Sequence, residues 1–122
     1  MVSARILVVE DDPGVRAVVE RGLRLAGHVP TMAGDLEAGR SAWAADSFDL
    51  VLLDVMLPDG DGLALLAERR GAGDETPTLL LTAREESELH QRADAAGATD
   101  YLAKPFAYAD LLALVDRLTG GR

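Results

Sequence analysis

The sequence contains no cysteine, which excludes disulfide bonds, thiolate metal sites and cysteine nucleophiles. Basic residues are few: 12 Lys and Arg stand against 21 Asp and Glu, and the net charge of −9 argues against direct binding to nucleic acid or an anionic membrane. No apolar run approaches the roughly 20 residues that span a bilayer, and the N-terminus lacks a signal-peptide pattern. We therefore expect a soluble cytoplasmic domain.

The 122 residues have the length of one domain, and strand-like and helix-like segments alternate along them five times. Strict alternation predicts an α/β fold, a three-layer doubly wound arrangement around a five-stranded parallel sheet. Asp12 and Pro13 are typical of a helix start, and Pro30 places the second strand at an edge of the sheet. We expect strands at residues 5–9, 29–33, 48–53, 78–81 and 100–103, and helices at residues 13–26, 36–45, 63–70, 85–96 and 107–118.

Polar residues stand where four of these strands end. The carboxyl ends of parallel strands share one edge of the sheet, so these side chains are expected to meet there. Clustered carboxylates, one hydroxyl and one ammonium suit a divalent cation and a phosphoryl group. The residues are Glu10, Asp11, Asp12, Asp54, Thr82 and Lys104, which is the only lysine in the chain.

Four blocks of sequence resemble the receiver domain of two-component response regulators: residues 6–12 (ILVVEDD), 52–62 (LLDVMLPDGDG), 82–83 (TA) and 97–106 (GATDYLAKPF). The resemblance covers the whole chain in order and spacing, and the four blocks together are specific. It implies one receiver domain over residues 1–122 with the flavodoxin-like strand order 2-1-3-4-5. The second and fourth blocks look most like the winged-helix, OmpR-like subfamily, whose output domain is not in this chain.

The resemblance implies that Asp54 is the phosphoacceptor. A carboxylate oxygen would attack the phosphorus of a phosphohistidine on a sensor histidine kinase and form an acyl phosphate. Lys104, the Thr82 hydroxyl and the main-chain N–H of Ala83 would contact the phosphoryl oxygens. Taken alone, Asp54 would more readily be an ordinary residue that ends a strand and caps the loop, and it is the combination with the other blocks that favours the acceptor role.

A Mg²⁺ ion, or Mn²⁺, is also implied. Asp11 would bind it directly, Glu10 through water, and Asp54 and the main-chain carbonyl of Met56 would complete the protein ligands. Asp12 is expected to cap the first helix instead.

Thr82 and Tyr101 would form the switch, with Tyr101 turning inward as Thr82 moves. Thr82 also begins an S/T-x-x-E sequence and could cap the fourth helix, so both roles stay open. The fourth helix, fifth strand and fifth helix would form the output face and a possible homodimer. Asp94, Leu114 and Asp116 depart from the usual pattern of that face, which predicts a variant dimer or a monomer with another partner.

Three other functions are less well supported. An aspartyl phosphatase would need a second Asp at position 56, which is Met; a flavodoxin-like carrier would need a phosphate-cradling loop after the first strand and more aromatics than 4%. A degenerate receiver that only binds partners is disfavoured because all acceptor residues are present.

Residues 59–62 suggest a calcium loop, but Leu63 and Arg70 occupy ligand positions of such a loop.

Smaller expectations concern single side chains. We expect a cis Lys104–Pro105 bond from the resemblance, Gly22 packed closely on the sheet, and Trp43 covering it. His28 and His90 are expected to be isolated surface residues, and Phe106 to belong to the core.

Overall fold

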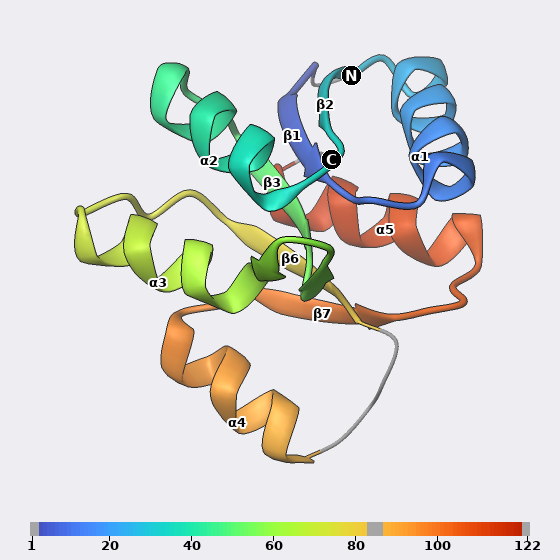
Figure 1. The fold of residues 1–122 in the computed structure, drawn as a ribbon. Helices are drawn as coiled ribbons and strands as arrows, with labels where there is room; N and C mark the ends of the chain where they lie inside the picture. The colour runs from blue at the N-terminus through green and yellow to red at the C-terminus, as the bar shows by residue number, and fades with distance from the viewer. Residues whose placement is uncertain (1–2, 83–86, 121–122) are drawn as a thin grey trace.

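A computed structural model describes residues 3–82 and 87–120 of the chain (Figure 1). The sheet has the order β2-β1-β3-β6-β7 with every pair parallel, which confirms the expected 2-1-3-4-5 order of the five long strands. Its strands are β1 (Arg5–Val9), β2 (Val29–Ala33), β3 (Leu50–Asp54), β6 (Thr78–Thr82) and β7 (Asp100–Ala103). The helices are α1 (Pro13–Leu25), α2 (Leu36–Ala45), α3 (Gly62–Gly71), α4 (Ser87–Ala96) and α5 (Tyr108–Leu118).

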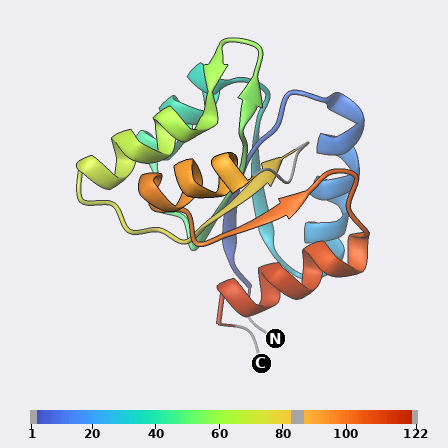
Figure 2. The same ribbon diagram turned by 90° about the horizontal axis from the view of Figure 1, so that it is seen from below.

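Helices cover both faces of the sheet and give the three expected layers (Figure 2). α1 and α5 enclose one core cluster, to which Val19, Leu23, Leu111 and Val115 contribute. α2, α3 and α4 enclose the other, where Trp43 is 1% exposed and lies over the sheet as expected. The central strands β3 and β6 are buried along their whole length, and this explains why they are apolar at nearly every position. In the described part of the chain no helix is both long and apolar enough to cross a bilayer.

Aspartates begin three of the helices, as side-chain capping of free N–H groups requires. Asp12, Asp35 and Asp61 each accept hydrogen bonds from backbone N–H groups in the first turn of α1, α2 and α3. Pro30 lies in β2, which pairs with β1 alone and is an edge strand, as predicted. Asp12 and Pro30 are thus found where the sequence placed them, at the start of the first helix and in an edge strand.

The expected loop after β3 contains a small antiparallel hairpin, β4 (Met56–Leu57) with β5 (Gly60–Asp61). Two-residue strands leave no periodic pattern in the sequence, which is why it was missed. The third strand also begins two residues later than predicted, at Leu50 instead of Phe48. Residues 85 and 86, placed in the fourth helix by the sequence pattern, lie outside the described residues.

Two predictions about single residues were wrong. The neighbour that requires a glycine at position 22 is α5 and not the sheet: a Cβ atom there would lie 2.1 Å from a ring carbon of Tyr108. The histidines are not isolated, because His28 Nδ1 accepts a hydrogen bond from Ala4 N (3.0 Å) and His90 stacks on Tyr101. All three contacts join segments that are distant in sequence, so no local pattern signals them.

Candidate functional site: an acidic cluster at the carboxyl ends of β1 and β3

Three carboxylates converge where β1 and β3 end. Val9 pairs with Leu53 across the two strands, so the residues that follow them, Glu10 and Asp54, are neighbours. One carboxylate oxygen from each of Glu10, Asp11 and Asp54 lies within 4.8 Å of the others. Glu10 is fully buried and Asp54 is 5% exposed, whereas Asp11 faces solvent. The cluster is therefore a partly buried set of oxygen donors that solvent reaches from the Asp11 side.

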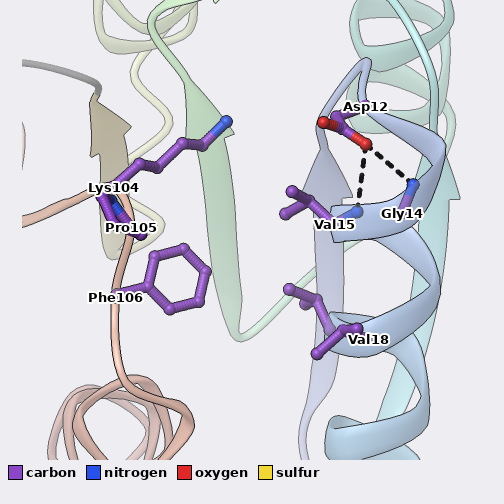
Figure 3. Close-up of a pocket in the computed structure, with 8 residues that line it drawn as sticks. Asp12, Gly14, Val15, Val18, Lys104, Pro105 and Phe106 are labelled. Atoms are coloured by element: carbon purple, nitrogen blue, oxygen red, sulfur yellow. Dashed lines mark hydrogen bonds between the residues drawn. The ribbon is translucent and has the colours of Figure 1, made fainter.

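Lys104 brings the opposing charge into this cluster. It follows β7 directly, and its main-chain N–H donates to the carbonyl oxygen of Thr82 (2.6 Å) at the end of β6. Its Nζ lies 3.1 Å from Asp54 Oδ2 and also forms an ion pair with Glu10 Oε1. Figure 3 shows the side chain stretched from its own segment toward β3. The structure thus unites the predicted acids with the single lysine.

Burial and charge crowding determine the protonation of the site. Burial, followed by the negative charge of Glu10, raises the pKa of Asp54 to about 6, while Lys104 and the N–H of Met56 oppose the rise. Burial alone would lower the pKa of Lys104, but its contacts with Glu10 and Asp54 outweigh burial and raise it. A single ammonium therefore compensates the three carboxylates only in part, and further positive charge would stabilise the ionised Asp54.

The donor set fits a hard divalent cation. Mg²⁺ prefers oxygen ligands, retains several waters and is commonly bound through one or two carboxylates. The cluster supplies these donors, and the exposed Asp11 leaves room for waters. Met56 N donates to Asp54 Oδ1 (3.0 Å), which orients the Asp54 carboxylate; a metal-ligand role for the Met56 carbonyl stays a prediction.

The loop that carries the acids is anchored at the start of α1. Asp12 Oδ1 accepts hydrogen bonds from Gly14 N (2.8 Å) and Val15 N (3.3 Å), drawn as dashed lines in Figure 3. Asp12 N in turn donates to Glu10 Oε2 (3.0 Å). Asp12 is therefore the helix cap that the sequence predicted, and its side chain is committed to that role.

Thr82 closes β6 and is 4% exposed. It pairs with Ala103, so it lies beside Lys104 at the same edge of the sheet. Ala83 and Glu85 lie outside the described residues, so both the main-chain donor at 83 and the capping box remain predictions. The position of Thr82 agrees with its expected place in the site.

Tyr101 lies outside the acidic cluster, half-buried on β7. Its hydroxyl donates to Asp94 Oδ1 (2.8 Å), and its ring stacks on His90 with a centroid distance of 4.4 Å and an interplanar angle of 8°. The hydrogen bond to Asp94, then burial and the charges of Asp94 and Asp100, raise the pKa of Tyr101. Two side chains of α4 thus hold the ring on the α4 side of β7.

An apolar cavity of about 510 Å³ opens beside Lys104, between α1 and the segment after β7 (Figure 3). No sequence pattern predicted this cavity, because Val18 keeps the helical spacing of the buried face of α1 and yet is 59% exposed in the structure. Phe106 packs against the core cluster beneath α1 and α5, as expected, and the Lys104–Pro105 bond is cis. Asp12, Gly14, Val15, Val18, Val19, Lys104, Pro105 and Phe106 line the cavity.

The sequence profile of the response regulator receiver domain matches residues 6–116. The chain belongs to this family. Response regulator MprA of Mycobacterium tuberculosis is 44% identical over 111 residues, which are 91% of this chain and 48% of MprA. Transcriptional activator protein PfeR of Pseudomonas aeruginosa is 43% identical over 116 residues, 95% of this chain and 38% of PfeR. The receiver domain thus spans less than half the length of these relatives, and its OmpR-like style agrees with them.

Solved structures show the same fold. The receiver domain of the Francisella response regulator 1452 superposes with a TM-score of 0.92 at 27% identity, covering 97% of this chain and 98% of that one. The receiver domain of the sensor histidine kinase PA1611 from Pseudomonas aeruginosa has a TM-score of 0.87 at 33% identity, covering 98% and 100%. That structure holds a magnesium ion in its active-site cleft.

Proposed function

We propose that this receiver domain accepts a phosphoryl group from the phosphohistidine of a sensor histidine kinase onto Asp54. The observation that carries the proposal is the position of the Asp54 carboxylate. It is almost buried at the end of β3, crowded by Glu10 and Asp11, and held by Lys104. A buried acid that is crowded by two other acids and paired with one lysine has its pKa shifted, and such shifted groups are common at functional sites.

In the proposed reaction an Asp54 oxygen forms a new P–O bond while the P–N bond of the phosphohistidine breaks, and the histidine nitrogen retains the electron pair. Lys104 is placed to contact a phosphoryl oxygen as a compact charge, since its Nζ is 3.1 Å from Asp54. Phosphoryl transfer needs positioning and charge neutralisation more than covalent help from the protein. The domain would promote its own phosphorylation and dephosphorylation, and it is a signalling domain, not a conventional enzyme.

Mg²⁺, or Mn²⁺, is the proposed cofactor, held by Asp11 directly, by Glu10 through water, and by Asp54 and the Met56 carbonyl. When bound, the ion would neutralise the carboxylates and the phosphoryl oxygens. The convergence of three carboxylates within 4.8 Å supports this role.

The proposed response begins at the phosphoryl group and ends at the surface of α4, β7 and α5. Thr82 and the N–H of Ala83 would hydrogen-bond the phosphoryl oxygens, and Tyr101 would leave its outward position as Thr82 moves. Phosphorylation would shift a pre-existing equilibrium between two conformations. The outward Tyr101, bonded to Asp94, fits the resting member of that pair.

The proposed partners follow from the surfaces on either side of the site. The apolar cavity beside Lys104 offers a kinase a place to dock within reach of Asp54. A homodimer through α4, β7 and α5 would be a variant one, because Asp100 already pairs with Arg117 of the same chain and Leu114 packs toward the core. Residues 1–122 would act as the receiver domain of a cytoplasmic transcription regulator, and this domain itself would make no direct contact with DNA.

Phosphotransfer from acetyl phosphate in the presence of Mg²⁺, followed by intact-protein mass spectrometry, tests the acceptor. Wild type should gain the mass of one phosphoryl group, Asp54→Asn should gain none, and the control Asp116→Asn on the exposed side of α5 should behave as wild type. An unchanged mass gain in Asp54→Asn would disprove the assignment.

A further inference from the structure

Arg16 reaches from α1 back to the loop that carries Glu10 and Asp11. Its Nη1 atom donates to the carbonyl oxygens of both residues, at 3.0 Å each. The side chain is half-buried, and neither contact belongs to a helix or sheet ladder. One guanidinium nitrogen therefore determines where two successive carbonyls of this loop point.

The guanidinium also lies close to Gly34, in the loop after β2. A Cβ atom on Gly34 would lie 2.9 Å from Arg16 Nη1 and 3.4 Å from Cζ. The same loop is tied to the acidic loop by the hydrogen bond from Glu10 N to Ala33 O (3.0 Å). Arg16 thus fills a space that a side chain at position 34 would narrow.

We infer that Arg16 is a positioning residue for the cation site. It orients the backbone of Glu10 and Asp11 so that their carboxylates are held toward Asp54, without itself touching the ion or the phosphoryl group. Charge-assisted hydrogen bonds are stronger than neutral ones, and a rigid guanidinium holds two acceptors better than a flexible ammonium does. The inference depends on the proposed Mg²⁺ role of Glu10 and Asp11.

Groups behind metal ligands commonly change metal affinity by about tenfold or more when they are removed. Arg16→Gln is therefore expected to weaken Mg²⁺ binding, measured by titration calorimetry, by about tenfold relative to wild type. Arg16→Lys should recover part of the affinity, and Arg21→Gln, an exposed arginine of the same helix, should leave it unchanged. At saturating Mg²⁺ the phosphotransfer rate of Arg16→Gln should return close to that of wild type.

Urea unfolding in chelator separates positioning from general stability. A positioning role predicts that the Mg²⁺ affinity of Arg16→Gln falls far more than that of any surface variant with the same unfolding midpoint. A dissociation constant within twofold of wild type would overturn the inference while leaving the acceptor assignment intact, whereas wild type that binds no Mg²⁺ would overturn both this inference and the proposed cation site. If Arg16→Gln does not fold, Gly34→Ala decides, because it displaces only the end of the arginine: weaker Mg²⁺ binding supports the inference, and unchanged binding contradicts it.

Discussion

The acidic site and the α4–β7–α5 face meet at the end of β7, since Tyr101 lies on this strand and Lys104 directly follows it. The polar contacts of the two regions nevertheless differ in their burial. Lys104 is 22% exposed and pairs with acids that are 0% and 7% exposed at their side chains. On the face, Arg117 and Asp100 pair at 64% and 28% exposure, and the bond from Tyr101 to Asp94 is also exposed. Water therefore screens the ion pairs of the face more strongly than those of the acidic site.

This difference in exposure changes how much the contacts of each region contribute to stability. Exposed ion pairs contribute between about 0 and 1 kcal/mol, so the contacts of the face can break and form again at little cost. Removing one partner of a buried pair leaves an uncompensated charge and costs about 3–5 kcal/mol. The contacts of the site are therefore expected to contribute more to the free energy of unfolding than those of the face.

The largest difference between the two regions is expected when the basic residue of each ion pair is replaced. Lys104→Met should lower the free energy of unfolding by about 3 kcal/mol at neutral pH, because Glu10 and Asp54 would remain buried and unpaired. The matched change Arg117→Met should lower it by less than about 1 kcal/mol. Urea unfolding of both variants in chelator measures the two values, and equal losses would show that burial does not distinguish the regions.

The burial of Asp54 should also make the free energy of unfolding depend on pH. The pKa of Asp54 is about 6 in the folded protein, above the ordinary value of 3.8, so folding favours its protonated form. Wild type should therefore lose stability through this group as pH rises from about 4 to about 6. Asp54→Asn cannot ionise, so it should match wild type below about pH 4 and exceed it above about pH 6 by at most about 3 kcal/mol.

Thermal or urea unfolding across this pH range in chelator tests the prediction. Asp116→Asn, on the exposed side of α5, serves as the control and should follow wild type at every pH. Saturating Mg²⁺ should remove the advantage of Asp54→Asn, since the cation favours the ionised acid. A constant difference between Asp54→Asn and wild type at all pH values would contradict the raised pKa.

The smallest expected effect concerns Tyr101. Asp94→Asn should lower the pKa of Tyr101 toward its ordinary value of 10.0, because the carboxylate that accepts its hydroxyl proton is the main cause of the raised pKa. The free energy of unfolding should change by no more than about 0.5 kcal/mol, as for most surface substitutions. Phenolate absorbance in a Tyr108→Phe background isolates the titration of Tyr101, and an unchanged titration would show that the hydrogen bond is not formed in solution.

Much of the site could be predicted from the sequence because its parts depend on local rules. Apolar runs that end in polar residues indicated strands with functional carboxyl ends, and the resemblance to receiver domains assigned Asp54, Asp11, Glu10 and Lys104 to one cluster, which the structure confirms. The helix cap at Asp12 was equally local, since it requires only an acceptor two and three residues before the N–H groups it binds.

The remaining features were decided by tertiary packing. Gly22 admits Tyr108, His90 stacks on Tyr101, and Arg16 holds the acidic loop against Gly34. The sequence by itself determined the order of strands and helices and the residues at the strand ends, because periodicity and capping act over a few residues. The division of the charges between a buried site and an exposed face was set by tertiary packing, because burial depends on segments that meet only after the chain has folded.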